Sequence, residues 1–175
     1  MIIETERLLL REPRITDIDD MYNNWASDPE VTKYLTWNYH KNKEETKTIL
    51  EKWINEIDDP KVHRFVISLK EDRRAVGTID IVDYDEKDGS PEIGYCISRK
   101  LWNQGYMSET AKAFIDYLFK QGFNKIRIGA YVENIASNRV IQKCGFTFTH
   151  QEYRERCSIF KPQPVTINWY EIVKK

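Results

Sequence analysis

The arrangement of strand-like segments in the middle of the sequence limits the fold more than any other feature. Residues 63–69, 75–84 and 91–98 are rich in β-branched and aromatic side chains and follow one another with only short polar turns between them. Consecutive strands joined this closely favour antiparallel pairing. An amphipathic helix that ends before Gly122 then leads to a strand over residues 125–132, and a strand–helix–strand connection favours parallel pairing. The sequence therefore predicts a mixed sheet of the α/β (α+β mixed) class.

Further elements lie on both sides of this unit. Residues 8–10 predict a first strand that ends before Pro13, and Thr16 begins a helix. We also expect a helix or turn at residues 28–30, helices over 43–57 and 135–143, and final strands over 146–155 and 165–173. No repeat or linker divides the chain. We therefore expect one domain over residues 1–175, with six to seven mostly antiparallel strands flanked by helices.

The composition narrows the classes of partner. Hydrophobic residues make up 41% of the 175 residues, and 27 basic against 28 acidic residues leave a net charge of −1. That balance argues against broad electrostatic binding to nucleic acid or an anionic membrane. The first residues lack a signal-peptide pattern, and no apolar run approaches the roughly 20 residues of a membrane span. Cys96, Cys144 and Cys157 are odd in number and lack metal-ligand spacing. We expect a soluble cytoplasmic protein, monomeric or homodimeric, without a metal and without direct binding to nucleic acid or membrane.

Two helix starts are suited to binding an anion. Gly105 precedes a helix whose apolar residues recur at three- and four-residue spacing, namely Met107, Ala111, Phe114, Ile115 and Leu118. Ser108 is available near the cap of this helix. A glycine turn before a helix leaves backbone N–H groups unpaired at the positive end of the helix dipole, which suits a phosphate or pyrophosphate. Residues 134–137 open a second short helix, which ends at residues 144–146.

Taken in order, these motifs resemble a known enzyme family. Residues 92–97 read Glu-Ile-Gly-Tyr-Cys-Ile, residues 102–109 read Trp-Asn-Gln-Gly-Tyr-Met-Ser-Glu, and Asn-Ile-Ala-Ser and Gly-Phe follow at 134–137 and 145–146. The combination is similar to the GNAT superfamily of acetyl-CoA-dependent N-acetyltransferases and covers nearly the whole chain. Within it the chain is most similar to the ribosomal-protein-alanine N-acetyltransferase branch. That branch shares the start Thr-Glu-Arg-Leu-Leu-Leu-Arg found at residues 5–11.

The resemblance implies a GNAT-like fold in which the fourth and fifth strands, 91–98 and 125–132, splay apart around the pantetheine arm of acetyl-CoA, the implied co-substrate. Backbone groups of Cys96, Ile97 and Ser98 would contact the pantetheine amides, and Asn134 and Ser137 would bind it from the second helix start. The pyrophosphate would rest on backbone N–H groups of Asn103, Gln104, Gly105, Tyr106, Met107 and Ser108.

The sequence departs from the family's motifs at several positions. In the pyrophosphate motif Trp102 replaces Arg or Gln, and Met107 replaces a small residue and adds bulk beside the phosphate path, so we expect weakened binding. Asn103 stands where the branch usually has a further glycine, and asparagine tolerates left-handed backbone angles. Ile141 replaces the tyrosine that serves many members as acid to the leaving thiolate. In the ribosomal-protein branch the serine that matches Ser137 is a proposed substitute.

Amide formation from a thioester needs a base for the amine and hydrogen-bond donors for the carbonyl oxygen and the departing sulfur. Glu92 is the candidate general base, directly or through water, because partial burial raises the pKa of a carboxyl; alternatively it is a structural carboxylate. A backbone N–H near Ile97 is the simplest donor to the carbonyl oxygen. Ser137 is the candidate donor to the sulfur, or an ordinary helix-start residue, while Asn134 caps that helix and can also bond the pantetheine.

The remaining aromatic and titratable residues allow more than one interpretation. Tyr34, Trp37 and Tyr39 either wall the acceptor site or pack against helices. The histidines at positions 40, 63 and 150 lie singly and are expected to be structural or on the surface. Cys96 lacks an identifiable activating base, so we expect direct transfer rather than a covalent cysteine intermediate.

Three functions are consistent with the sequence. The leading hypothesis is acetyl transfer to a protein N-terminal amine, as in the ribosomal-protein-alanine type. The second keeps the chemistry but takes a small amine, such as an amino acid, a polyamine or an antibiotic. The third is a non-catalytic acyl-CoA-binding module, which the departures at Asn103, Met107 and Ile141 motivate.

Overall fold

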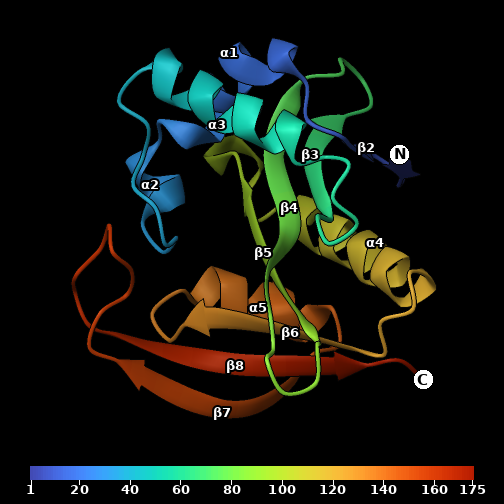
Figure 1. Ribbon diagram of the computed structural model, residues 1–175, viewed down its shortest axis with the longest axis vertical. Helices are drawn as coiled ribbons and strands as arrows, with labels where there is room; N and C mark the ends of the chain where they lie inside the picture. The colour runs from blue at the N-terminus through green and yellow to red at the C-terminus, as the bar shows by residue number, and fades with distance from the viewer.

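One sheet organises the molecule, and alternating side chains on its strands build a core layer on each face. The computed structural model describes residues 1–175, and its strands follow the order β1-β2-β3-β4-β5-β6-β8-β7 (Figure 1). The strands are β1 (Ile2–Glu4), β2 (Leu8–Arg11), β3 (Arg64–Leu69), β4 (Ala75–Tyr84), β5 (Pro91–Ile97), β6 (Lys125–Tyr131), β7 (Thr147–Arg154) and β8 (Val165–Val173). The helical segments are η1 (Ile15–Asp17), α1 (Ile18–Met21), η2 (Tyr22–Ala26), α2 (Pro29–Thr32), α3 (Lys43–Asn55), η3 (Arg99–Leu101), α4 (Tyr106–Lys120) and α5 (Ile135–Lys143).

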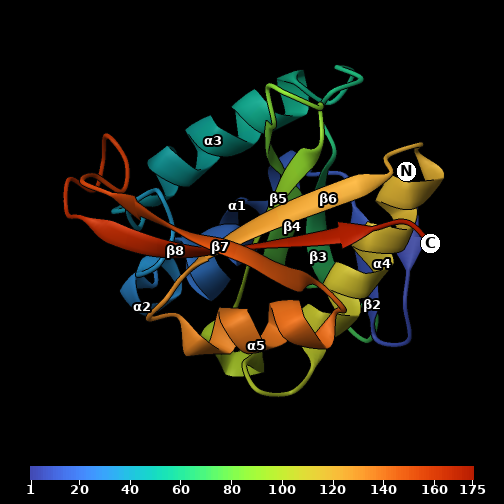
Figure 2. The ribbon, with the colours of Figure 1, turned by 90° about the horizontal axis from the view of Figure 1, so that it is seen from below.

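The two core layers explain which way each residue of β5 faces. Ile93 and Ile97 belong to the larger layer, which the sheet forms with α4 and α5. Cys96 belongs to the second layer, where it joins Trp25 of η2 and Leu50 of α3. Figure 2 shows α3 and α5 on opposite sides of the sheet. A ligand that enters the sheet beside β5 is therefore within reach of side chains from both faces.

The sheet is mostly antiparallel, with one parallel junction. The strands from β1 to β5 pair antiparallel with their neighbours, as do β6 with β8 and β8 with β7. The parallel junction, β5 with β6, contains a single residue pair, Glu92 with Arg127. Beyond this pair the two strands diverge, and Figure 1 shows β6 crossing below β5 rather than running beside it. The predicted mixed sheet and its splay are confirmed.

The element bounds agree closely with those predicted, with two differences at the N-terminal end. The sheet has eight strands rather than six to seven, because β1 was missed. β1 has three residues and pairs only with β2, so it is too short to show a strand period. The single helix expected from Thr16 is divided into η1, α1 and the π-helical η2. None of the helices combines the length and the apolar character needed to cross a membrane.

Candidate active site

The turn before α4 presents backbone N–H groups to the surface. Gly105 is the N-cap residue with φ of 82°, and Asn103 has φ of 59°, so both adopt left-handed angles. Glycine does so without a Cβ clash, and asparagine does so more readily than most residues. No side chain caps α4, so its first N–H groups remain free at the positive end of the helix dipole. The tight turn and the left-handed asparagine expected from the sequence are both present.

Met107 and Ser108 lie differently from the way their motif suggested. The Met107 side chain is 8% exposed and belongs to the core beneath α4, because it follows the apolar stripe of the helix. It therefore adds no bulk on the outer side of the turn, and the structural reason to expect weakened phosphate binding is absent. Ser108 is buried within the first turn of α4 and does not cap the helix. Both residues can offer an anion only their backbone N–H groups.

Arg7 links the turn before α4 to the N-terminal strands through hydrogen bonds, a role that the sequence did not reveal. Its Nη1 donates to the Gln104 carbonyl oxygen at 3.1 Å, and its Nε donates to Glu109 Oε2 at 2.8 Å. The guanidinium lies over the Tyr106 ring, 3.8 Å from its centroid. Burial opposes ionisation of Glu109, but hydrogen bonds from Thr5 and Arg7 lower its pKa on balance, so the pair stays charged. The signal in the sequence was the shared Thr-Glu-Arg start, which served only as a family resemblance.

The backbone of β5 offers alternate residues to the splay. Ser98 N–H donates to the Val76 carbonyl of β4 at 2.7 Å, and in an antiparallel pair every second residue turns its polar groups toward the same neighbour. Cys96 therefore also faces β4, whereas the backbone of Ile97 faces the splay. The Ile97 carbonyl accepts from Trp102 Nε1 at 3.0 Å, which leaves the Ile97 N–H for a ligand. Of the three residues expected to contact pantetheine, Ile97 is the one with an available backbone donor.

The start of α5 lies across the splay from β5. Asn134 is the N-cap residue, and its Oδ1 accepts from Ser137 N–H at 3.1 Å. The Tyr95 hydroxyl of β5 lies 2.9 Å from Ser137 Oγ, so a hydrogen bond joins the two walls of the opening. Burial raises the pKa of Tyr95, which keeps its hydroxyl protonated. Tyr95 was not among the site residues expected from the sequence, and Ile141, which stands in place of the family's tyrosine, is a core residue, 1% exposed.

Glu92 lies on the other face of the sheet, at the closed end of the splay. Its Oε2 accepts from Arg127 Nη2 at 3.3 Å, and Arg127 also pairs with Asp85. Burial raises the pKa of Glu92, while the hydrogen bond from Arg127 opposes this rise. The side chain keeps 22% of its surface exposed, so water can reach the carboxylate. These features allow Glu92 to accept a proton, directly or through water.

Two loops meet on this face at the outer end of β6. The Tyr34 ring packs edge-on against Tyr131, the last residue of β6, with centroids 6.2 Å apart. The Tyr131 hydroxyl contacts the Cys157 thiol of the loop between β7 and β8. In the same loop the buried Lys161 Nζ donates to the Thr32 carbonyl at the end of α2, at 2.5 Å. The loop after α2 and the loop after β7 therefore form one connected wall.

Trp37 and Tyr39 differ from Tyr34 in their surroundings. Trp37 packs against the second core layer, with its ring centroid 5.4 Å from that of His40. Tyr39 is 46% exposed to solvent. The core contacts of Trp37 fit the packing interpretation. Its neighbours Thr36 and Asn38 bond Ser158 and Phe160 of the same wall, so the acceptor-site role of Trp37 and Tyr39 stays a prediction.

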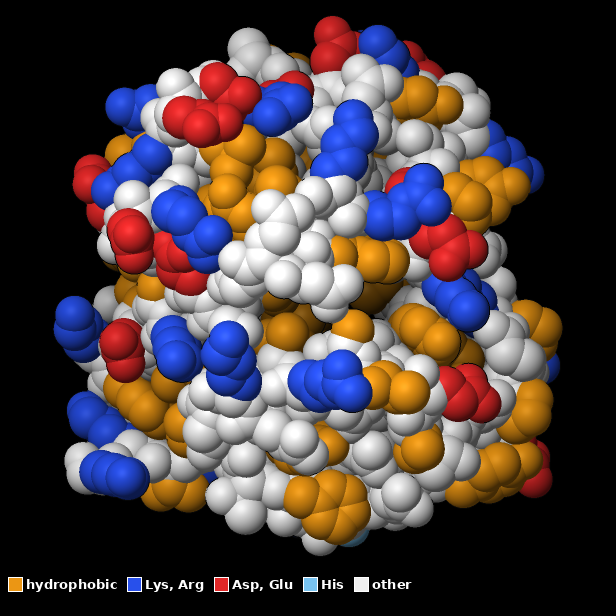
Figure 3. All heavy atoms as spheres, turned by 180° about the vertical axis from the view of Figure 1, so that it is seen from behind, with side chains coloured by type: hydrophobic (Ala, Val, Ile, Leu, Met, Phe, Trp, Pro, Cys, Tyr) orange, Lys and Arg blue, Asp and Glu red, His pale blue; other side chains and the backbone are white.

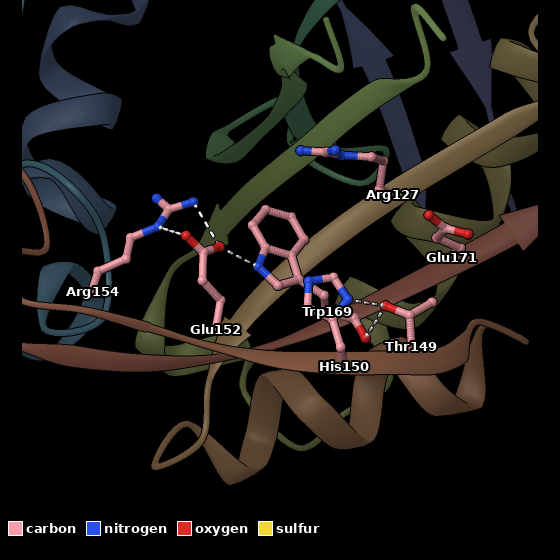
Figure 4. Close-up of a pocket in the computed structure, with 7 residues that line it drawn as sticks. All are labelled: Arg127, Thr149, His150, Glu152, Arg154, Trp169 and Glu171. Carbon is pink, nitrogen blue, oxygen red and sulfur yellow. Dashed lines mark hydrogen bonds and ion pairs between the residues drawn. The ribbon is translucent and has the colours of Figure 1, made fainter. Parts of the chain in front are cut away.

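A shallow hollow of about 120 Å³ continues this face over β6, β8 and β7. Figure 4 shows Trp169 at its centre, with side chains from all three strands around it. Glu152 accepts from Trp169 Nε1 at 2.7 Å and pairs with Arg154 at 2.8 Å, while Arg127 lies over the indole ring from the other side. His150 stacks on Trp169 and belongs to the surface of the hollow. The positive charges here are already paired with carboxylates, so the hollow is polar without a strong excess of either sign.

The face with α4 and α5 has a different charge pattern. Figure 3 shows a hollow with an apolar floor in the middle of this face, and Lys and Arg side chains gathered along its margins. The helical segments on this side carry the exposed residues Lys100, Lys112, Arg139 and Lys143. Such a positive margin attracts an anionic ligand toward the two helix starts.

The remaining titratable groups have structural partners. His40 and His63 bond Thr46 and Tyr117, each at 2.8 Å, and burial lowers the pKa of both imidazoles. The three cysteines are buried and unpaired, and burial raises the pKa of Cys96 to about 11, which leaves it a poor nucleophile. No group of three or more His, Cys, Asp or Glu side chains is arranged to hold a metal ion.

Comparisons with known proteins agree with this geometry. Residues 7–147 match the family model described as acetyltransferase (GNAT) domain. The uncharacterized N-acetyltransferase p20 of Bacillus licheniformis is 33% identical over 144 residues, which are 81% of this chain and 80% of that protein. The crystal structure of a GNAT-family acetyltransferase from Bacillus anthracis is 28% identical with a TM-score of 0.83, covering 99% of this chain and 98% of that one. RimL, a ribosomal L7/L12 alpha-N-protein acetyltransferase solved with coenzyme A, has a TM-score of 0.84 at 19% identity, with coverage of 99% and 98%. At that identity the likeness to RimL concerns the fold alone.

Proposed function

Since this chain belongs to the GNAT family of N-acetyltransferases, we propose that it transfers the acetyl group of acetyl-CoA directly to a protein N-terminal amine. The observation that carries the proposal is the splay. β5 and β6 pair only at Glu92 and Arg127, and the opening beyond that pair is flanked by the starts of α4 and α5. An opening in a sheet with an anion site at its mouth suits a long, narrow ligand that ends in phosphates.

The proposed cofactor position follows from the free backbone donors. The pyrophosphate lies on the N–H groups of the turn from Asn103 to Ser108, near the positive margin of that face. The pantetheine runs into the splay, where the Ile97 N–H meets one of its amides and the Asn134 side-chain NH₂ meets another. Asn134 can do both jobs, because its Oδ1 caps α5 while its nitrogen remains free. The acetyl group then lies between β5 and β6.

The proposed chemistry places the two reactants on opposite faces of the sheet. The cofactor enters from the side of α4 and α5, and the amine enters from the side of α3, where Glu92 lies. Glu92, directly or through water, takes the proton that the amine loses as it attacks the thioester carbonyl. Ser137, on the cofactor side, donates a hydrogen bond to the sulfur as it leaves. Holding both reactants in line supplies much of the rate by itself.

The acceptor side supports a peptide more than a strongly charged small amine. Tyr34 and the loop that contains Cys157 and Lys161 form one wall, and the hollow around Trp169 extends the surface beyond the reacting centre. Because the charges of that hollow are already paired, it lacks the concentrated negative charge that a polyamine would need. A polar surface that continues past the amine suits a chain that follows the amine.

The test is thiol release from acetyl-CoA in the presence of a panel of acceptors. We expect peptides with a free N-terminus to accelerate release and the same peptides with a blocked N-terminus to have no effect. Mass spectrometry then locates the acetyl group on the α-amine. If only amino acids, polyamines or antibiotics accelerate release, the protein acceptor is wrong and the small-amine alternative is correct. If coenzyme A binds but no amine in the panel accelerates release, the protein acceptor is wrong and the non-catalytic acyl-CoA-binding alternative is favoured.

A further inference from the structure

Tyr95 lies where β5 has already parted from β6. The last residue pair between these strands is Glu92 with Arg127, and Tyr95 follows on the diverging part of β5. Its ring packs against the larger core layer, and its hydroxyl lies 2.9 Å from Ser137 Oγ in the first turn of α5. The two hydroxyls therefore bridge the opening on the cofactor side.

The partners of Ser137 leave its hydroxyl free for a task other than capping. Its backbone N–H is already satisfied by Asn134 Oδ1, and Tyr95 is the one side chain that hydrogen-bonds its Oγ. A serine hydroxyl has one hydrogen to donate and two lone pairs to accept with. When Tyr95 donates to one of those lone pairs, the hydrogen of Ser137 must point elsewhere.

The direction of the hydrogen bond follows from the phenol. The Tyr95 ring packs, partly buried, against the larger core layer, and burial raises its pKa, so the phenol keeps its proton throughout the neutral range. Either hydroxyl can donate on geometry alone, and we assign Tyr95 as the donor, because a partly buried phenolic hydrogen needs an acceptor and Ser137 Oγ is the acceptor present. A hydroxyl that accepts such a bond becomes a better donor, because hydrogen bonds in a chain polarise one another.

We propose that Tyr95 is a positioning residue, which holds the Ser137 hydroxyl as a hydrogen-bond donor to the sulfur of acetyl-CoA. This inference rests on the proposed function. When the tetrahedral intermediate collapses, the carbon–sulfur bond breaks and its electron pair goes to sulfur. The Ser137 hydrogen stabilises that thiolate, while the proton of the amine goes to Glu92 or water. No proton leaves Tyr95, so the step requires no buried phenolate.

The arrangement compensates for the residue at position 141. Ile141 is fully enclosed in the core and has no hydrogen to offer the leaving group. The hydroxyl pair of Tyr95 and Ser137 approaches the same opening from β5 and the first turn of α5.

The first test measures the thiol of bound coenzyme A, which requires no acceptor amine. A hydrogen bond to the thiolate lowers the pKa of the thiol, so we expect the bound thiol to titrate about one pKa unit below free coenzyme A. Tyr95→Phe and Ser137→Ala should each return it toward the free value. Ultraviolet absorbance of the thiolate, with the ligand-free protein as blank, follows the titration. If Tyr95→Phe titrates like the wild type, the proposal is wrong, whatever Ser137→Ala does.

The second test is a double-mutant cycle on turnover. We expect Tyr95→Phe to lower kcat about 10-fold with an unchanged KM for acetyl-CoA, and the double variant with Ser137→Ala to be no slower than Ser137→Ala alone. Tyr170→Phe is the matched control, because it removes a buried hydroxyl that donates to Asn138 Oδ1 of the same helix at 2.6 Å. That control should keep the wild-type kcat. Additive effects of the Tyr95 and Ser137 substitutions would overturn the proposal.

The two tests separate this inference from the proposed function. A lowered thiol pKa that depends on Tyr95, in a protein that acetylates no peptide, would leave the Tyr95 role intact and refute the protein acceptor. Normal peptide acetylation, together with a thiol pKa that does not depend on Tyr95, would refute the Tyr95 role and leave the protein acceptor intact. If Tyr95→Phe does not fold, the Ser137→Ala titration compared with Ser137→Thr, which restores a hydroxyl, decides whether the sulfur has a donor at this position.

Discussion

At the scale of single residues, the proposed proton acceptor and the hydroxyl pair lie on opposite faces of β5. Alternation along the strand turns Glu92 toward the side of α3 and Tyr95 toward the side of α5. In the proposed mechanism the amine therefore loses its proton on one side of the thioester, and the sulfur leaves on the other. Glu92 and Tyr95 lie on one strand, so β5 fixes the separation between the proposed base and the residue that positions the Ser137 donor.

Glu92→Gln removes the proposed base and keeps the shape of the side chain. We expect kcat near neutral pH to fall about 100-fold, within the range that a positioned base contributes. In the wild type kcat/KM rises with pH as Glu92 loses its proton, and burial moves this rise above the usual range of a carboxyl pKa. In the variant, kcat/KM should lack this rise and should depend on pH only through deprotonation of the acceptor amine. A pH–rate profile with the same acid limb as the wild type would remove Glu92 from the mechanism.

Asp83 provides a check on the sign of this pH dependence. It lies opposite Glu92 in the register of β4 and β5, and its negative charge contributes to the raised pKa of Glu92. Asp83→Asn keeps the base but removes that charge, so we expect the acid limb of kcat/KM to move to lower pH with the plateau unchanged. A move to higher pH would show that another group produces the limb.

Asn103, Met107 and Arg7 show what a sequence can tell about single residues. The left-handed angle of Asn103 follows from a local preference, so it was predictable. The buried position of Met107 also follows from helix periodicity, but the motif comparison pointed the other way. Arg7 and Tyr95 could not be placed, because their partners Gln104 and Ser137 are distant in the sequence and only the fold brings them together.

At the scale of elements, the backbone rather than any side chain shapes the turn before α4. We expect Gly105→Val to reduce the affinity for coenzyme A at least about 10-fold, because a β-branched residue at φ of 82° costs roughly 1–2 kcal/mol and its side chain also crowds the N–H groups. Asn103→Gly, the matched variant, keeps the left-handed angle and should bind normally. Calorimetric titration compares the two. Normal affinity of Gly105→Val would exclude this turn as the pyrophosphate site.

Arg7 links β2 to the same turn, so its loss should act on the cofactor rather than on the chemistry. The ion pair with Glu109 is partly exposed, and we assign it about 1 kcal/mol, which corresponds to roughly a fivefold rise in the KM for acetyl-CoA upon Arg7→Met. The kcat should change little. Arg14→Met, an exposed arginine with no salt bridge, is the control and should leave KM unchanged. A lowered kcat with an unchanged KM would contradict this role.

Most elements could be predicted because they are long enough to show a clear repeat of apolar residues. β4, α5 and β8 have the predicted bounds, and each shows a clear alternation or a clear apolar stripe. β1 was missed because three residues are too few to define a period. The segment from Ile15 to Ala26 was predicted as one helix because its apolar spacing is helical, although its hydrogen bonds change type along the way.

At the scale of the whole molecule, two core layers lie on opposite faces of one sheet, and we propose that residues 1–175 form one domain. The junction of β5 and β6 has fewer residue pairs than any other junction in the sheet, because only Glu92 and Arg127 pair there. The sequence could not show the strand order, since β8 enters between β6 and β7 and such a choice depends on pairing between distant segments. The splay was predictable only through the family resemblance.

A ligand that occupies this boundary should stabilise the whole molecule. At 100 times its Kd, coenzyme A adds about 2.7 kcal/mol to the free energy of unfolding, which for a chain of 175 residues raises Tm by about 5–10 °C. Differential scanning calorimetry should show one transition with and without the ligand. Gly105→Val, with an affinity about 10-fold lower, should show about half of this shift at the same concentration. Two separate transitions would indicate that the parts on either side of the splay unfold independently, and would contradict the single domain.

The position of β8 also decides when the site comes into existence during synthesis. β7 pairs with β8 alone, and β6 meets β7 only through β8. A ribosome makes β6, α5 and β7 first and β8 afterwards, and at roughly 5–20 residues per second the delay is on the order of seconds. Until β8 emerges, β6 lacks its antiparallel partner and the lower wall of the splay cannot form. We therefore expect a nascent chain to hold acetyl-CoA in the splay only after almost all of these residues have been translated.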